Sequence, residues 1–169
     1  FVFPSSALVY ERKRPFYYLK KTLEDLPKIY KVKSLGLRIF PVYGIGEGER
    51  GHPTAIYQWI KQMMRGKQPI IYGSGRQSRD FIYISDVVEN ILNLALAGET
   101  GVRDIGRGEK IVFNGIIKFI NIELGSSLKA KYIPAPKDYT AGVICTNPVP
   151  CKVNIWEGIR RMIEEFRKT

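Results

Sequence analysis

The sequence predicts an α/β fold, because short strand-like segments alternate with amphipathic helices along its 169 residues. Apolar residues make up 44% of the chain and aromatic residues 12%, which is typical of a globular protein with a substantial core. Apolar runs stay below the roughly 18 residues that a membrane-spanning helix requires. We therefore expect a cytoplasmic protein that does not enter a membrane.

The first third of the chain predicts two strands that flank a helix. Residues 1–3 are expected to form a short buried strand that ends in a Pro-Ser-Ser turn. A helix is expected over residues 15–32, with Pro15 suited to its first turn. Residues 35–42 predict a second buried strand, and the glycine-rich segment 44–48 predicts a flexible loop.

The middle of the chain continues the alternation. A helix that begins at Pro53 is predicted from apolar residues at helical spacing, namely Ile56, Trp59, Ile60, Met63 and Met64. Residues 69–72 and 80–84 predict strands joined by a Gly-Ser-Gly turn. Ser85 is expected to cap the next helix, with Asp86 at its positive end.

The last third predicts two strands and two helices. Residues 102–105 and 128–133 predict strands, and residues 113–124 predict a helix closed by Gly125. The segment 134–150 contains four prolines and is expected to be a loop. A final helix is predicted from apolar residues on one side: Ile155, Trp156, Ile159, Met162, Ile163 and Phe166.

The net charge of +11 limits the classes of partner. Lysine and arginine are spread along the chain, which favours a solvated basic face or a phosphate-bearing substrate over nucleic acid. Cys145 and Cys151 have a spacing that matches no common zinc pattern, and His52 is the single histidine. We therefore expect no metal site.

One pair of residues predicts acid–base chemistry. Tyr17 and Lys21 are four residues apart, so a helix would place both side chains on one face. A cation beside a phenol stabilises the phenolate, and such a phenol can take or return a proton while hydride leaves or returns. Ser6 could hydrogen-bond the reacting oxygen. A helix that merely packs an aromatic ring inward is the structural alternative.

Two longer segments carry a family resemblance. The segment GLRIFPVYG from Gly36 to Gly44, and the segment GSGRQSRDFIYISDVV from Gly73 to Val88, resemble "LRxFNVYG" and "RDFIYVxDVV" in order and spacing. Those motifs occur in nucleotide-sugar epimerases and dehydratases, which are extended short-chain dehydrogenases/reductases. Residues 132–138 are similar to the substrate-side loop of the UDP-glucose 4-epimerase and ADP-heptose 6-epimerase branch.

This resemblance implies the C-terminal part of a Rossmann-like doubly wound parallel sheet plus a small α/β substrate-binding subdomain. Residues 1–44 would be a remnant of the dinucleotide-binding domain. Residues 45–169 would mainly form the substrate-binding subdomain, with strands that return to the Rossmann sheet. The family's glycine-rich cradle for pyrophosphate is not found in the sequence. We therefore expect a fragment, or a chain completed by another copy.

The resemblance also implies a function. The expected enzyme is an NAD- or NADP-dependent epimerase that oxidises a hydroxyl of a nucleotide-diphosphate sugar to a keto intermediate and reduces it again. A homodimer is expected. The alternative is a catalytically degenerate module that binds a nucleotide sugar or a partner without the cofactor.

Residue roles follow from the same resemblance. Ser6, Tyr17 and Lys21 are implied as catalytic residues. Ser5, Phe40 and again Tyr17 and Lys21 are implied as contacts of the cofactor.

Three further residues are implied as substrate contacts. Arg79 would hold the diphosphate, because a planar guanidinium can bond two phosphate oxygens at once. Tyr43 and Gln77 would also contact substrate. The alternative for Arg79 is a surface salt bridge with Asp80.

The sequence departs from the family pattern around Tyr17 and at Pro41, among other positions. A gapless alignment anchored on Pro15 and Glu24 places Phe16 and Lys20, instead of Tyr17 and Lys21, at the tyrosine and lysine. In that alignment the catalytic phenol is absent. A family asparagine that touches substrate is Pro41 here.

Overall fold

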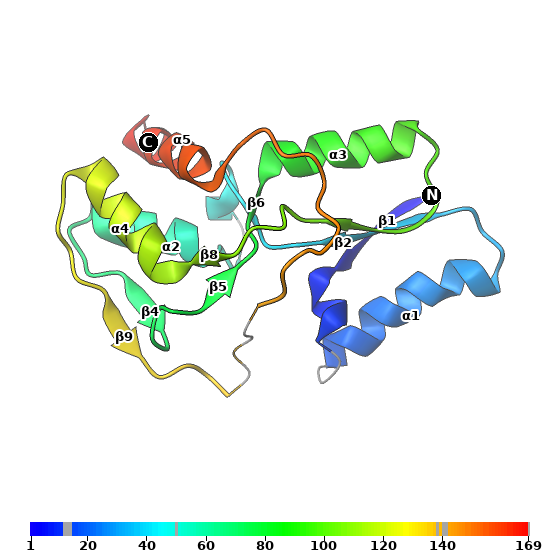
Figure 1. Ribbon diagram of the computed structural model, residues 1–169, viewed down its shortest axis with the longest axis horizontal. Helices are drawn as coiled ribbons and strands as arrows, with labels where there is room; N and C mark the ends of the chain where they lie inside the picture. Colours follow the sequence, from blue (N-terminus) through cyan, green and yellow to red (C-terminus); the bar gives the residue numbers. More distant parts are fainter. Residues whose placement is uncertain (12–14, 50, 138, 140–141, 169) are drawn as a thin grey trace.

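The computed structural model describes residues 1–11, 15–49, 51–137, 139 and 142–168. Its central element is a parallel sheet in the order β1-β2-β7. The three strands are β1 (Val2–Ser6), β2 (Leu35–Ile39) and β7 (Gly101–Ile105). Helix α1 (Pro15–Ile29) lies on one face of this sheet and helix α3 (Ile84–Leu96) lies on the other (Figure 1). Parallel strands covered by helices on both faces are the arrangement of a doubly wound fold.

Strand β1 is longer than predicted. It continues through Pro4 to Ser6 and is followed by a 3₁₀ helix, η1 (Ala7–Tyr10), so the predicted turn at Pro-Ser-Ser is wrong. A proline has no backbone N–H to donate, and it is tolerated here because β1 is the end strand of the described sheet. The Ser6 side chain then caps η1 by accepting a hydrogen bond from the Leu8 N–H at 3.2 Å.

The predicted strand over residues 35–42 is two strands. β2 ends at Ile39, and β3 (Val42–Tyr43) pairs in parallel with β6 (Ile82–Tyr83). Pro41 separates them, and its carbonyl accepts the Ile82 N–H at 3.0 Å. The chain therefore leaves the central sheet at residues 40–41.

Helix boundaries also differ from the expectations. α1 ends at Ile29, three residues before the predicted end. α3 begins at Ile84 with Tyr83 at its N-cap and without a side-chain cap, so the prediction for Ser85 is wrong. The Asp86 carboxylate instead accepts the backbone N–H groups of residues 152 and 153, both at 3.1 Å.

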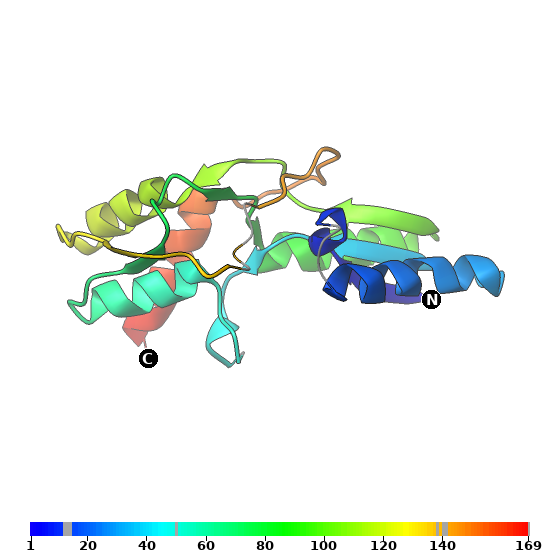
Figure 2. The same cartoon turned by 90° about the horizontal axis from the view of Figure 1, so that it is seen from below.

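A second, mainly helical part lies beside the sheet (Figure 2). Its helices are α2 (Ala55–Met64), α4 (Phe113–Leu124) and α5 (Ile155–Lys168), and η2 (Glu47–Glu49) is a single 3₁₀ turn. Two strand pairs border these helices: β4 (Ile70–Tyr72) with β9 (Lys131–Ile133), and β5 (Ser78–Arg79) with β8 (Ile111–Val112). The three helices predicted in this part are therefore confirmed, although the one predicted from Pro53 begins at Ala55, after an N-cap at Thr54.

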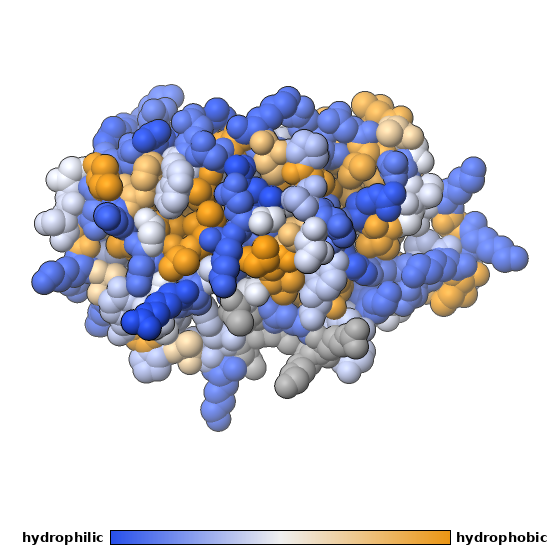
Figure 3. Space-filling view, viewed as in Figure 1, coloured by the Kyte–Doolittle hydropathy of each residue, from blue (hydrophilic) through white to orange (hydrophobic). Residues whose placement is uncertain are grey.

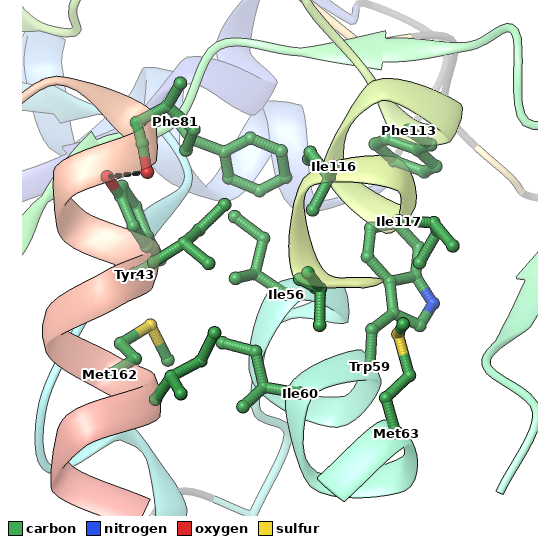
Figure 4. Close-up of a cluster of buried hydrophobic side chains, with 14 of the residues drawn as sticks. Tyr43, Ile56, Trp59, Ile60, Met63, Phe81, Phe113, Ile116, Ile117 and Met162 are labelled. Carbon is green, nitrogen blue, oxygen red and sulfur yellow. Dashed lines mark hydrogen bonds between the residues drawn. The ribbon is translucent and has the colours of Figure 1, made fainter. Parts of the chain in front are cut away.

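The described residues form two hydrophobic cores. The helical core is filled by side chains from α2, α4 and α5 together with Tyr43 and Phe81 (Figure 4). The sheet core is filled by Ala7, Leu35, Leu37, Phe40, Ile82, Val87, Ile105 and Cys145. Successive residues of a strand point to opposite sides, so Phe81 and Tyr83 enter the helical core while Ile82 enters the sheet core. Residues 81–83 thereby join the two cores.

The surface is mixed in polarity. Charged and polar side chains cover much of the face seen in Figure 3, with apolar patches between them. None of the described helices combines the length and the apolar character that crossing a membrane requires.

Candidate functional site

A cleft of about 680 Å³ lies at the carboxyl ends of β1 and β2. One wall consists of residues 6–8 and residues 39–42, which follow directly from these two strands. The rest of the lining includes Arg79, residues 142–143 and the first turn of α3. A crevice outside the carboxyl ends of parallel strands is where open α/β sheets bind their ligands.

The cleft brings together three of the predicted site residues. Ser6, Phe40 and Arg79 all line it, although they are far apart in the sequence. Phe40 is 2% exposed, so its ring forms the floor of the cleft and part of the sheet core. The polar side chains of the described lining are those of Ser6, Glu11 and Arg79.

Arg79 is held in place by two neighbours. Its guanidinium lies over the ring of Tyr139, 5.3 Å from the centroid. Gly142 lies on another side, with a φ of +93°, and a Cβ added there would come within 2.5 Å of the Arg79 Nη1. Only glycine fits this approach without displacing the guanidinium. The arginine is thereby placed at the cleft wall by local packing.

Asp80 does not form the surface salt bridge considered as the alternative for Arg79. It is fully buried, and its carboxylate accepts backbone N–H groups of Arg107 at 3.2 Å, Gly108 at 2.9 Å and Cys145 at 2.9 Å. Burial raises the pKa of Asp80, and these backbone donors oppose the rise. Asp80 thus connects the loop after β7 to the segment that supplies residues 142–143 of the cleft.

Ser5 belongs to a buried polar network and is not part of the cleft lining. Its hydroxyl donates to the Glu24 carboxylate at 2.7 Å, and Arg38 donates to both Glu24 oxygens at 2.8 and 2.7 Å. Ser5 is 5% exposed. The contact of Ser5 with the cofactor stays a prediction; in this structure its hydroxyl faces α1 and is bonded to Glu24.

The same network extends across the sheet. The register places Ser5 beside Arg38, and Arg38 beside Asp104, on three adjacent strands. Tyr10 connects the last two: its hydroxyl accepts from Arg38 at 2.9 Å and donates to Asp104 at 2.8 Å. One row of polar groups therefore ties α1 and η1 to all three strands of the sheet.

We predict that this network makes stability depend on pH through Glu24. Burial acts to raise the pKa of Glu24, but hydrogen bonds from Arg38 and Ser5 outweigh burial and hold its pKa below 4.5. A carboxyl whose pKa is lower in the folded state stabilises the fold above its unfolded pKa and loses that effect as the pH falls through its folded pKa. The free energy of unfolding should therefore decline below pH 4.5.

Urea denaturation on both sides of that pH would measure the decline. The Glu24→Gln variant, which has no carboxyl to titrate at this position, should lose stability less steeply over the same range. Equal slopes in the two proteins would show that the network does not control this dependence.

The predicted acid–base pair is arranged differently from the expectation. Tyr17 is half-buried and packs edge-on against Tyr18, with ring centroids 5.1 Å apart. The Lys21 ammonium is bonded to Asp25 at 3.1 Å and lies 3.7 Å from Glu24. Among the described residues, no hydrogen bond joins Tyr17 to Ser6 or to Lys21.

The roles predicted for Tyr43 and Gln77 in substrate binding stay predictions, and the structure gives both side chains other partners. Tyr43 is 1% exposed in the helical core, where its hydroxyl donates to the Ile155 carbonyl at 3.4 Å (Figure 4). Burial raises the pKa of this phenol. Gln77 donates to the carbonyl of Tyr72 and so closes the turn over residues 73–76. Both side chains have structural partners and lie outside the cleft lining.

A sequence model of the NAD dependent epimerase/dehydratase family matches residues 13–106, which is more than half of the chain. The chain belongs to this family. Its parallel sheet and the cleft at the strand ends agree with the Rossmann-like architecture that the family resemblance implied.

Three similar proteins illustrate the relationship. The uncharacterised UDP-glucose epimerase YtcB of Bacillus subtilis is 36% identical over 143 residues, covering 71% of this chain and 43% of that protein. A UDP-glucose 4-epimerase of Thermotoga maritima, solved with UDP-glucose, is 26% identical with a TM-score of 0.88 over 99% of this chain and 63% of its own. A UDP-glucuronic acid 4-epimerase of Bacillus cereus, solved with UDP-glucuronic acid and NAD, is 23% identical with a TM-score of 0.84 over 99% of this chain and 61% of its own.

The chain is shorter than its relatives. It spans 34% and 32% of the length of two Methanocaldococcus jannaschii relatives, and less than two thirds of the Thermotoga maritima epimerase. Family members hold the pyrophosphate of NAD at a glycine-rich turn between a strand and a helix. No described strand of this chain has that connection, since the glycine-rich segment 44–48 leads into η2. The described residues therefore do not supply a pyrophosphate cradle.

Proposed function

We propose that the chain provides the substrate side of an NAD-dependent nucleotide-sugar epimerase. The observation that carries this proposal is the cleft at the carboxyl ends of β1 and β2, where the Ser6 hydroxyl and the Arg79 guanidinium share one lining. A hydroxyl suits the reacting oxygen of a sugar, and a guanidinium suits a diphosphate. The family match and the sugar-nucleotide complexes of the similar proteins support this assignment.

The roles proposed for Arg79 and Ser6 follow from these positions, and those proposed for residues of α1 follow from the family resemblance. Arg79 binds the diphosphate and so fixes the sugar in the cleft. Ser6 hydrogen-bonds the sugar oxygen that loses its proton, and Tyr17 on α1 is the proposed acceptor of that proton. Bound NAD supplies the acceptor for the hydride that leaves the same sugar carbon. A lysine of α1 stabilises the phenolate form of the tyrosine.

Two further expectations remain predictions. The proposed homodimer would cover the apolar side chains that α1 exposes at helical spacing: Leu19, Leu23 and Leu26. A cytoplasmic location is proposed together with this metabolic role.

Turnover by the product of the whole gene tests the proposed function. We expect that protein to convert UDP-glucose to an epimer when NAD is present, as detected by nuclear magnetic resonance of the sugar. Binding of UDP-glucose without NAD binding or turnover would instead support the degenerate module. A protein that binds neither compound would contradict both functions.

The Arg79→Lys variant should lower the affinity for UDP-glucose by roughly tenfold or more, the scale of losing one hydrogen bond to a charged group. A lysine keeps the charge but cannot bond two phosphate oxygens in one plane. Isothermal titration calorimetry measures the affinity. Arg76→Lys, in the exposed turn three residues earlier, is the matched control and should bind like the wild type.

A further inference from the structure

A second pocket, of about 340 Å³, lies at the opposite end of the central sheet from the cleft. It forms where α1 turns into β2 and where the chain enters β7, so it lies at the amino ends of these two parallel strands (Figure 1). Three lysines belong to its lining: Lys28, Lys31 and Lys33. The pocket shares no described residue with the lining of the cleft.

The lining of this pocket carries a net positive charge. No described residue forms an ion pair with Lys31 or Lys33, whereas Lys28 is paired with an acid of its own helix. The acid of the lining is Glu24, and Arg38 donates to both of its carboxylate oxygens, at 2.8 and 2.7 Å. The negative charge of Glu24 is therefore offset by Arg38, and the two unpaired ammonium groups leave the pocket positive.

A buried hydroxyl lies at the same place. Ser34 lines the pocket and is 9% exposed, and no described residue is hydrogen-bonded to its hydroxyl. Side chains alternate along a strand, and Arg38 reaches Glu24 of α1, so Ser34, four residues before Arg38, lies on the face that α1 covers. Buried hydroxyl groups normally have a partner. A ligand in the pocket would supply the partner that the fold does not.

The backbone at Lys31 gives an independent indication. Lys31 is the one described residue other than glycine with a positive φ, at +52°. The Val32 N–H donates to the Pro27 carbonyl at 2.9 Å, which is the bond of a helix end that favours glycine at position 31. A side chain with this backbone conformation costs free energy. The lysine thus weakens the helix end, and what it adds there is a cation at the pocket.

We propose that this pocket binds a phosphate group, either as free phosphate or as part of a small phosphorylated metabolite. The Ser34 hydroxyl donates to a phosphate oxygen, and the ammonium groups of Lys31 and Lys33 balance the charge of the phosphate. A concave pocket of this volume fits a small anion, whereas nucleic acid is bound along an extended basic surface. The site is separate from the cleft and does not depend on the proposed function.

The first test removes the buried hydroxyl. Isothermal titration calorimetry with inorganic phosphate measures binding to the product of the whole gene. Ser34→Ala should lower the affinity for phosphate roughly tenfold, the scale of one hydrogen bond to a charged group. The melting temperature should not fall, because the hydroxyl has no partner in the fold. Unchanged phosphate affinity in Ser34→Ala would overturn the site as described.

The second test separates binding from stability at Lys31. Lys31→Gly should lower the affinity for phosphate by about two- to fivefold, the range of an exposed ion pair. Its melting temperature should stay at the wild-type value or rise, because glycine adopts the left-handed conformation freely. Lys33→Met should cause a similar loss of affinity. Lys118→Met, on an exposed position of α4, is the matched control and should bind phosphate like the wild type.

Two further measurements locate the site and identify the source of the phosphate. Arg79→Lys, which alters the cleft, should leave phosphate affinity unchanged. Tighter binding of glucose 1-phosphate than of inorganic phosphate would identify a phosphorylated sugar as the ligand, and the reverse order would identify the free ion; both support the site. A wild-type protein that does not bind either compound would overturn it, as would binding that Arg79→Lys removes and the pocket variants leave intact.

Discussion

Replacing Tyr17 with phenylalanine is expected to lower kcat for UDP-glucose in the product of the whole gene by roughly 100-fold or more, the range typical of losing a general acid–base group. The phenyl ring keeps the edge-on packing against Tyr18, which is 5.1 Å away between centroids. The hydroxyl that would exchange the sugar proton is lost. KM should change much less than kcat, because the proposed contacts of Arg79 with substrate are untouched.

Tyr18→Phe is the control for this variant. Tyr18 is the next residue of α1 and is 65% exposed, so losing its hydroxyl should leave kcat within about twofold of the wild type. A Tyr17→Phe protein that keeps full turnover would show that the phenol of the reaction is not Tyr17. That result would favour the alternative alignment, in which Phe16 occupies the tyrosine position of the family.

Removing the Asp80 carboxylate should cause the largest loss of stability among the substitutions considered. Asp80→Ala leaves three backbone N–H groups without their acceptor: those of Arg107, Gly108 and Cys145. An unsatisfied buried donor costs about 1–3 kcal/mol, so the free energy of unfolding should fall by about 3–5 kcal/mol. Urea denaturation followed by circular dichroism measures this change.

Asp25→Ala is the matched control for Asp80→Ala. Asp25 is a half-exposed residue of α1 whose ion pairs with Lys21 and Lys28 lie at the surface. Surface ion pairs contribute about 0–1 kcal/mol, so this variant should remain close to the wild type. Equal stability of the two variants would contradict the role assigned to Asp80.

The alternation of elements could be predicted from the sequence because helices and strands depend on local periodicity. The apolar residues of α2, α4 and α5 recur at helical spacing, and these helices are present in the structure. The boundaries of the strands were harder to predict from the sequence. Pro4 is read locally as a turn, yet pairing with β2 keeps it in β1, and that partner is more than thirty residues away.

The candidate site shows the same limit. Ser6, Phe40 and Arg79 were identified from motifs, and the structure brings them to one cleft. Ser5 and Tyr43 were assigned from the same motifs, but their partners are Glu24 and Ile155, which no local pattern connects to them.

The sequence analysis assigned no buried structural role to two acids, Glu24 and Asp80. The neighbours of Glu24 in α1 are exposed or half-buried and give no sign of its burial, but Asp80 lies among partly or fully buried neighbours, and a buried acid requires partners. That pattern predicts a bonded carboxylate without saying which groups bond it.

The three-residue segment 81–83 has a consequence for recognition. Because its side chains enter both hydrophobic cores, the wall that bears Ser6 and the wall that bears Arg79 are joined by close packing. The spacing between hydroxyl and guanidinium is therefore set when the chain folds. A sugar nucleotide would meet a preorganised cleft, and little conformational freedom would be lost there on association.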